Sequence, residues 1–294
     1  MAILKNAATQ NRMRQSNARL KERLGKLSGL DRVLLGGSGL VADLRRDILD
    51  LADTGAAVFI EGETGTGKEL VARALHDLSA DADAPFLALN CATLSADTFE
   101  AEMFGTADRG TGRLLAASGG TLFLDEICSC PPLVQAKLLR VIEDKTLLPI
   151  GAQEPIPVRF RVISATNEDM AQAVRDNRFR QDLLFRINTV TLHLPALRDR
   201  REDLVLLATH FLKDYARIYE TACPSIAQDD LAALLAHDWP GNVRELRNAC
   251  ERRVLAARRG GGGFADAIHA DQGLADVPDT LREAVAAFER ELIA

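Results

Sequence analysis

The sequence predicts an α/β domain built on a parallel sheet, followed by a smaller all-helical subdomain. Short apolar runs alternate with helical stretches between residues 40 and 199, a pattern typical of a parallel sheet with helices on both faces. After residue 200 only helical patterns follow. The chain has 294 residues, 47% of them hydrophobic, which is enough for a sizeable buried core.

The expected elements follow in order along the chain. Residues 9–27 are polar with leucines at helical spacing, which fits a thin amphipathic helix or a solvated linker equally well, and a helix face begins near residue 41. The expected strands are 56–60, 85–89, 121–124, 159–164 and 189–194, with helices at 68–79 and 133–144 among them. Three helical patterns follow, at 202–219, 229–239 and 242–257. Residues 258–279 contain four consecutive glycines and are expected to form a flexible linker before a last helix at 280–294.

Composition argues against several classes of protein. The formal net charge of -6 is unlike a free-standing nucleic-acid binder, although a local basic patch stays open. The five cysteines are scattered, and the C-S-C spacing of Cys128 and Cys130 matches no common zinc pattern, so we expect reduced thiols. With no apolar run long enough to span a bilayer and no apolar signal segment, we expect a cytoplasmic protein.

The strongest chemical signal is the stretch GETGTGKEL, which lies between an expected strand and an expected helix. It contains the pattern G-x-x-x-x-G-K, in which glycines let the backbone wrap a phosphate and the lysine adds a positive charge. The generic pattern ends in Ser or Thr, whose hydroxyl binds Mg²⁺. Glu69 stands there instead, so the metal must be held by another residue and by water. The nucleotide-binding residues predicted here are Gly62, Glu63, Thr64, Gly65, Thr66, Gly67, Lys68, Glu69 and Leu70.

Polar side chains end two further expected strands. In GGTLFLDEI, Asp125 can orient Mg²⁺ directly or through water, and Glu126 can polarise a water for in-line attack on the γ-phosphate. An apolar run followed by Asp-Glu is common and by itself can be a mere strand end. On a strand next to the phosphate loop it becomes a strong indication of a catalytic site. In VISATN, Asn167 ends a strand, where its amide can sense the γ-phosphate or position water.

Three arginines are candidates for contacts with a nucleotide. Arg180 and Arg186 flank QDLLF, where they are either ordinary surface charges or, as in ring-shaped ATPases, groups that stabilise charge in the neighbouring subunit's site. Arg244 lies in the first turn of a helix after Pro240 and Gly241. It can reach back over the nucleotide, or it can pair with Glu245 or Glu251.

Together these stretches resemble a known family. GETGTGKE, NCATL, EMFG, GGTLFLDEI, QAKLLRVIE, SATN, FRQDLLFRIN, LPALRDRREDL and WPGNVRELRN resemble, in this order, the AAA+ domain of sigma-54-dependent transcriptional activators (bacterial enhancer-binding proteins). Within that family the sequence looks most like dicarboxylate-transport response regulators of two-component systems. The resemblance implies a helical linker at 1–31, an α/β nucleotide-binding subdomain at 32–199, a helical lid at 200–258 and a truncated DNA-binding region at 259–294.

The resemblance also implies cofactors, partners and residue roles. It implies ATP and Mg²⁺, and a ring, usually a hexamer, that uses hydrolysis to remodel the closed complex of sigma-54 RNA polymerase. Asn90 resembles the switch residue that holds the catalytic glutamate, and Asn167 resembles the first sensor. Arg180 and Arg186 resemble the trans-acting arginines and Arg244 the second sensor, while Glu69 is the family's usual residue at its position.

The sequence departs from the family in three places. Members carry the sequence G-A-F-T-G-A in a loop that touches sigma-54, and here only residues 106–118 join the FG and GGTLFLDE blocks, so we expect that loop to be missing. We also expect no receiver before the ATPase and no complete helix-turn-helix after it. ATP hydrolysis is therefore the expectation. The alternative is an ATP-binding modulator, or a remnant, that assembles with full-length activators without remodelling the polymerase.

Overall fold

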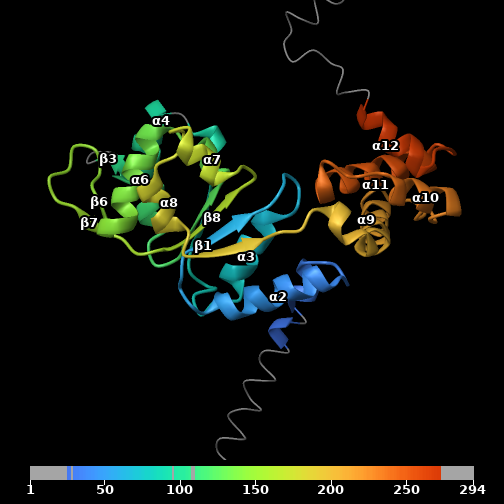
Figure 1. The fold of residues 1–294 in the computed structure, drawn as a ribbon, viewed down its shortest axis with the longest axis horizontal. Helices are drawn as coiled ribbons and strands as arrows, with labels where there is room; N and C mark the ends of the chain where they lie inside the picture. Colours follow the sequence, from blue (N-terminus) through green and yellow to red (C-terminus); the bar gives the residue numbers. More distant parts are fainter. Residues whose placement is uncertain (1–24, 28, 95, 107–109, 273–294) are drawn as a thin grey trace, which may run out of the picture. The chain divides into compact units, whose positions relative to one another are not determined.

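The protein is described by a computed structural model covering residues 25–27, 29–94, 96–106 and 110–272. The chain divides into two compact units between Arg200 and Arg201, and each unit is considered by itself (Figure 1). No helix in the part of the chain that the structure describes is both long enough and apolar enough to cross a membrane.

A five-stranded parallel sheet forms the centre of the first unit, which confirms the predicted α/β class. The strand order is β2–β5–β8–β1–β9, and each strand lies within two residues of its expected position. The strands are β1 (Val58–Glu61), β2 (Phe86–Asn90), β5 (Thr121–Asp125), β8 (Arg161–Thr166) and β9 (Val190–His193).

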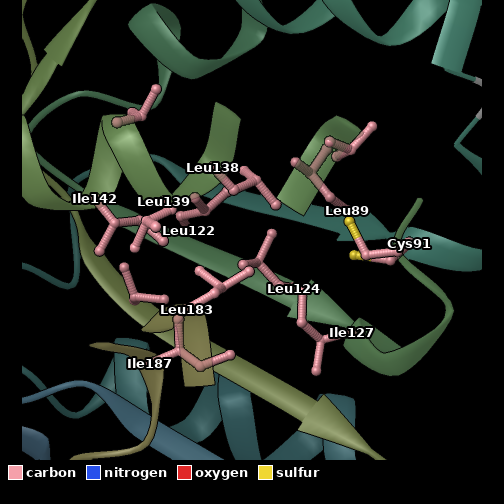
Figure 2. Packing of buried hydrophobic residues seen from close by; sticks show 14 of the residues in the cluster. Leu89, Cys91, Leu122, Leu124, Ile127, Leu138, Leu139, Ile142, Leu183 and Ile187 are labelled. Carbon is pink, nitrogen blue, oxygen red and sulfur yellow. The ribbon is translucent and has the colours of Figure 1, made fainter. Parts of the chain in front are cut away.

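Helices cover both faces of this sheet because successive strand residues point to opposite sides. On one face Phe123 and its neighbours pack against α2 (Gly39–Ala52) and α3 (Lys68–Asp77). On the other, Leu122 and Leu124 contribute to a second cluster with the remaining helices (Figures 1 and 2). Those helices are α4 (Ala96–Phe104), α5 (Arg113–Ala116), α6 (Pro132–Asp144), α7 (Met170–Arg175) and α8 (Gln181–Ile187).

Two short antiparallel ribbons lie outside the main sheet. One pairs β3 (Gly105–Thr106) with β4 (Gly110–Thr111), and the other pairs β6 (Thr146–Leu147) with β7 (Ile156–Pro157). A bridge between Thr106 and Ile150 joins the two, and the Ile150 N–H donates to the Gly105 carbonyl at 3.0 Å. The β3–β4 ribbon therefore occupies the stretch in which the sequence predicts that the family's contact loop is missing.

The second unit is helical, and a short 3₁₀ segment, η3 (Leu197–Asp203), leads into it. Trp239, the only tryptophan of the sequence, is fully buried, and its indole N–H donates to the Leu234 carbonyl at 3.0 Å. The helices are α9 (Leu204–Ile218), α10 (Gln228–Ala236), α11 (Asn242–Arg258) and α12 (Phe264–Gln272).

Helix α12 corrects the prediction of a flexible linker at 258–279, which is wrong over Phe264–Gln272. Phe264, Ala267 and Ile268 are buried and lie at the spacing of one helix face. Asp230 of α10, itself 4% exposed, fixes the start of the helix by accepting the Phe264 N–H at 2.7 Å. The glycines themselves lie outside both helices, since α11 ends at Arg258 and α12 begins at Phe264, and burial of the apolar face after them makes this segment helical. Residues 273–279 of the expected linker lie outside the described residues.

The segments expected at the two ends of the chain lie largely outside the described residues. Of the segment expected at 9–27 only residues 25–27 are described, and they are helical, as are residues 29–33. The helix expected at 280–294 lies outside the described residues.

Candidate nucleotide-binding site

The sheet order gathers the phosphate loop, Asp125, Glu126 and Asn167 at one edge. In a parallel sheet all carboxyl ends lie at the same edge, and β8 lies between β5 and β1. In register, Asn90 lies opposite Asp125, and Glu61, which precedes the phosphate loop, lies opposite Thr166. The phosphate loop, the Asp-Glu pair and Asn167 therefore follow three adjacent strands.

The phosphate loop, Gly62–Lys68, has a backbone that depends on its glycines. Gly67 has a φ of 104°, which a side chain would strain, and a Cβ on Gly62 would lie 2.9 Å from Leu194 Cβ. The Lys68 ammonium donates to the Gly62 carbonyl at 2.8 Å and to the Glu63 carbonyl at 3.0 Å, which folds it across the loop. Lys68 begins α3, whose N-cap, Gly67, provides no side-chain cap to the backbone N–H groups. This arrangement fits a bound triphosphate.

Among the other predicted nucleotide-binding residues, one is buried and three are exposed. Thr66 is buried, and its hydroxyl donates to the Glu63 carbonyl at 2.8 Å, which stabilises the turn of the loop. Thr64, Glu69 and Leu70 are exposed at the start of α3 and along the loop. The Thr64 hydroxyl contacts the end of β8, where it accepts a hydrogen bond from the Asn167 amide at 2.9 Å.

Asp125 and Glu126 occupy the end of β5 and the residue after it. The Asp125 carboxylate accepts the Glu126 N–H at 3.0 Å, and Glu126 has a φ of 51°, an uncommon left-handed conformation for a residue with a side chain. Among the described residues no three His, Cys, Asp or Glu side chains are grouped to hold a metal. A single strand-end carboxylate fits Mg²⁺, which takes its remaining ligands from phosphates and water.

Two asparagines at this edge make different contacts. The Asn167 side-chain N–H donates to the Thr64 hydroxyl at 2.9 Å, which joins the end of β8 to the phosphate loop. The Asn90 side-chain oxygen instead accepts the Ala92 N–H at 2.9 Å and caps the short helix η1 (Cys91–Thr93). Its predicted role in holding Glu126 stays a prediction.

Arg180 and Arg186 differ in their surroundings. Arg180 is the N-cap of α8 and forms a two-fold contact with Asp182, at 3.0 Å and 2.6 Å, which lowers the pKa of that carboxyl. Arg186, in the last turn of α8, lines an open hollow of about 800 Å³ together with Lys145 and Arg159. This hollow runs along the amino ends of the strands, so Arg186 lies at the sheet edge opposite its own phosphate loop.

Arg244 belongs to the second unit, in the first turn of α11, and is exposed. The two carboxylates suggested as its alternative partners have other contacts. Glu245 contacts His237 at 2.6 Å and accepts the Gly241 N–H at 2.8 Å. Glu251 accepts a hydrogen bond from the hydroxyl of Tyr219.

Sequence reasoning missed two residues next to the predicted site. Arg198 pairs through both terminal nitrogens with the carboxylate of Glu63, one contact measuring 2.8 Å, and so ties the phosphate loop to η3. Gln135 of α6 is 1% exposed and bonds three backbone groups on either side of it. The QAKLLRVIE block contained Gln135, but nothing local indicated its partners.

Comparison with known proteins settles the family. Residues 34–193 match the model of the sigma-54 interaction domain, and residues 198–269 match the AAA+ ATPase lid domain. The chain belongs to the sigma-54 interaction domain family. The lid match reaches into α12, in agreement with the helical structure found there.

Relatives of this sigma-54 interaction domain are transcription regulators. It is 41% identical to the C4-dicarboxylate transport transcriptional regulatory protein DctD of Pseudomonas aeruginosa, over 99% of this chain and 64% of that protein. It is 43% identical to the DNA-binding transcriptional activator HyfR of Escherichia coli, over 85% of this chain and 38% of that protein. The chain thus spans between about a third and two thirds of the length of these relatives.

Among solved structures, NtrX of Brucella abortus has the same fold. Its complex with ATP superposes with a TM-score of 0.77 at 36% identity, covering 99% of this chain and 67% of that one. Its complex with ADP gives a TM-score of 0.76. These matches confirm the AAA+ P-loop fold that the sequence predicted.

Proposed function

We propose that this chain binds ATP with Mg²⁺ and hydrolyses it as the motor of a transcription regulator of the sigma-54 activator type. The observation that carries the proposal is the convergence of the phosphate loop, Asp125-Glu126 and Asn167 on one sheet edge. The ATP and ADP complexes of NtrX support nucleotide binding by this fold.

Each residue has a defined task in the proposed reaction. Lys68 and the N-terminus of α3 bind the phosphates, and Glu126 accepts a proton from the attacking water. Asn167, held by Thr64, orients that water or the γ-phosphate. Asp125 would hold Mg²⁺, which when bound neutralises charge on the phosphate oxygens.

Hydrolysis is proposed to take place between copies of the chain. Arg186 is separated from its own phosphate loop by the length of the strands, which supports a role at the nucleotide of a neighbouring subunit. Phe185 beside it is 73% exposed, an apolar surface suited to contact with a second copy. A closed ring, hexameric as in the family, would give every subunit the same contact.

A second candidate function is favoured by the β3–β4 ribbon. Its two strands hold only two residues each, in the stretch where the family's sigma-54 contact loop was expected to be missing. A chain of this kind can bind and hydrolyse ATP, and assemble with full-length activators, without remodelling sigma-54 RNA polymerase itself.

Phosphate release and open-complex formation, followed together on a sigma-54 promoter, test both candidates. We expect phosphate release that Lys68→Ala abolishes through loss of nucleotide binding and that Glu126→Gln abolishes while binding is kept. Wild-type hydrolysis by Glu126→Gln contradicts the assignment of the base. Phosphate release accompanied by open complexes supports the activator, and release without them supports the modulator.

A further inference from the structure

Gln135 connects the segment after Glu126 to the segment that carries the arginines. Its side-chain N–H groups donate to the Cys130 carbonyl at 2.7 Å and to the Arg178 carbonyl at 3.0 Å. Its side-chain oxygen accepts the Arg180 N–H at 2.9 Å. One buried amide therefore bonds the end of the turn after β5 and both sides of the entry to α8.

The core does not require an amide at this position. The neighbouring positions on the inner face of α6, Val134 and Leu138, are apolar and buried, and a methionine would fill a similar volume without polar atoms. A buried amide is tolerated because its hydrogen bonds are made, and these bonds constrain geometry more strictly than apolar contact does.

The contact with Arg180 determines where α8 begins. Arg180 is the N-cap of this helix, its carbonyl accepts the Leu184 N–H at 3.1 Å, and its own N–H is bound by Gln135. Helix α8 is seven residues long, and Arg186 lies in its last turn. Fixing the first residue of so short a helix also fixes the backbone from which Arg186 extends.

We propose that Gln135 is a positioning residue for Arg186. It holds α8 in register with the segment that follows Glu126, so a change at a subunit's own nucleotide is passed to the arginine that this subunit offers to its neighbour. The inference rests on the proposed function, in which Arg186 acts at the neighbouring subunit's nucleotide.

Mixed rings test this role. Gln135→Met removes the three hydrogen bonds at nearly constant volume and is expected to lower kcat at least tenfold, with the KM for ATP within about twofold of wild type. Mixing it in equal amounts with Glu126→Gln should restore hydrolysis above that of either variant alone. The Glu126→Gln copies supply well-placed arginines to the intact phosphate loops of the Gln135→Met copies, a pairing that random assembly gives at about a quarter of sites.

Two controls make the outcomes distinguishable. Arg186→Ala mixed with Glu126→Gln should regain activity in the same way, and Gln172→Met, at an exposed glutamine of α7, should behave as wild type. Recovery with Arg186→Ala but not with Gln135→Met overturns the positioning role and leaves the proposed function standing. Recovery with neither shows that the arginine does not act in trans, which overturns both the trans role and this inference.

A second variant distinguishes a loss of folding from a loss of Arg186 positioning. If Gln135→Met loses its cooperative thermal transition, Gln135→Asn is mixed with Glu126→Gln in its place, because it keeps a neutral amide in the buried site while its shorter side chain cannot reach all three backbone partners. Recovery in this mixture supports the positioning role, and its absence beside a recovering Arg186→Ala mixture overturns it.

Discussion

The side-chain amide of Asn167 donates to the hydroxyl of Thr64 across 2.9 Å, which joins the end of β8 to the phosphate loop. The two residues are 103 positions apart in the sequence and come together because β8 pairs with β1. This hydrogen bond places the Asn167 side chain beside the phosphate loop, one residue after the end of β8.

We expect Asn167→Ala to lower kcat for ATP hydrolysis about 10- to 100-fold while the Kd for ATP changes little, because the amide is proposed to act on the attacking water or the γ-phosphate. Thr64→Val removes the supporting hydroxyl and should have a smaller effect in the same direction. Steady-state phosphate release and equilibrium binding of a fluorescent ATP analogue measure the two quantities. Equal losses of binding and turnover would assign Asn167 to the loop's structure instead.

Arg186 should matter more for catalysis than Arg180. The guanidinium of Arg180 is engaged by Asp182, whereas Arg186 has no ion-pair partner among the described residues. Arg186→Ala is expected to lower kcat on the order of 10³-fold, and Arg180→Ala considerably less. Comparing the two variants at protein concentrations that saturate assembly gives the ranking, and the reverse order would contradict it.

The Arg198–Glu63 pair should contribute to nucleotide affinity more than to stability. Both side chains are 42% exposed, so the pair is worth roughly 0–1 kcal/mol to folding. Arg198→Lys cannot keep the two-nitrogen contact and should raise the Kd for ATP several-fold with almost unchanged Tm. Calorimetric titration and thermal melting check this, and a lowered Tm with unchanged Kd would contradict it.

Helix α12 should be essential to the stability of the helical unit. Phe264 is fully buried, so Phe264→Ala is expected to cost about 3–5 kcal/mol of unfolding free energy. Ile218→Ala is the matched control, because Ile218 is 62% exposed and should lose little. Denaturant titration of both variants measures the difference, and similar losses would show that α12 does not stabilise the unit.

The thiols should differ sharply in reactivity. Burial raises the pKa of Cys250 to about 12, and the neighbouring Cys130 thiol together with burial raises the pKa of Cys91. Since the thiolate is the reactive form, these thiols stay protonated and inert from pH 7 to 9. Cys223 is exposed and should be alkylated first by iodoacetamide in the folded protein, as followed by peptide mass spectrometry. Early labelling of Cys250 would contradict the buried placement.

Features predicted from the sequence were those encoded by contiguous residues. The five strands and the phosphate loop are local patterns, because an apolar run of strand length and a glycine-lysine spacing need no distant partner. The sequence placed Asp125 and Asn167 at the ends of two strands, and the strand order of the parallel sheet brings these ends to one carboxyl edge.

Features missed were those that depend on distant partners. Gln135 bonds Arg178 and Arg180 more than 40 residues away, and Arg198 meets Glu63 across 135 positions. In the helical unit, the four consecutive glycines led to the prediction of a flexible linker. Phe264 nevertheless begins an apolar helix face immediately after them. Burial by α10 and α11, rather than local propensity, determines that this segment is helical.

The short ribbon of Gly105–Thr106 with Gly110–Thr111 has a consequence for engineering. Its two strands are fixed by their own pairing and by the bridge to Ile150, so residues inserted between positions 106 and 110 would begin and end at anchored strands. Loop-closure entropy rises by only about 0.6 kcal/mol for each doubling of loop length. A longer contact loop grafted between Thr106 and Gly110 should therefore cost the fold little free energy.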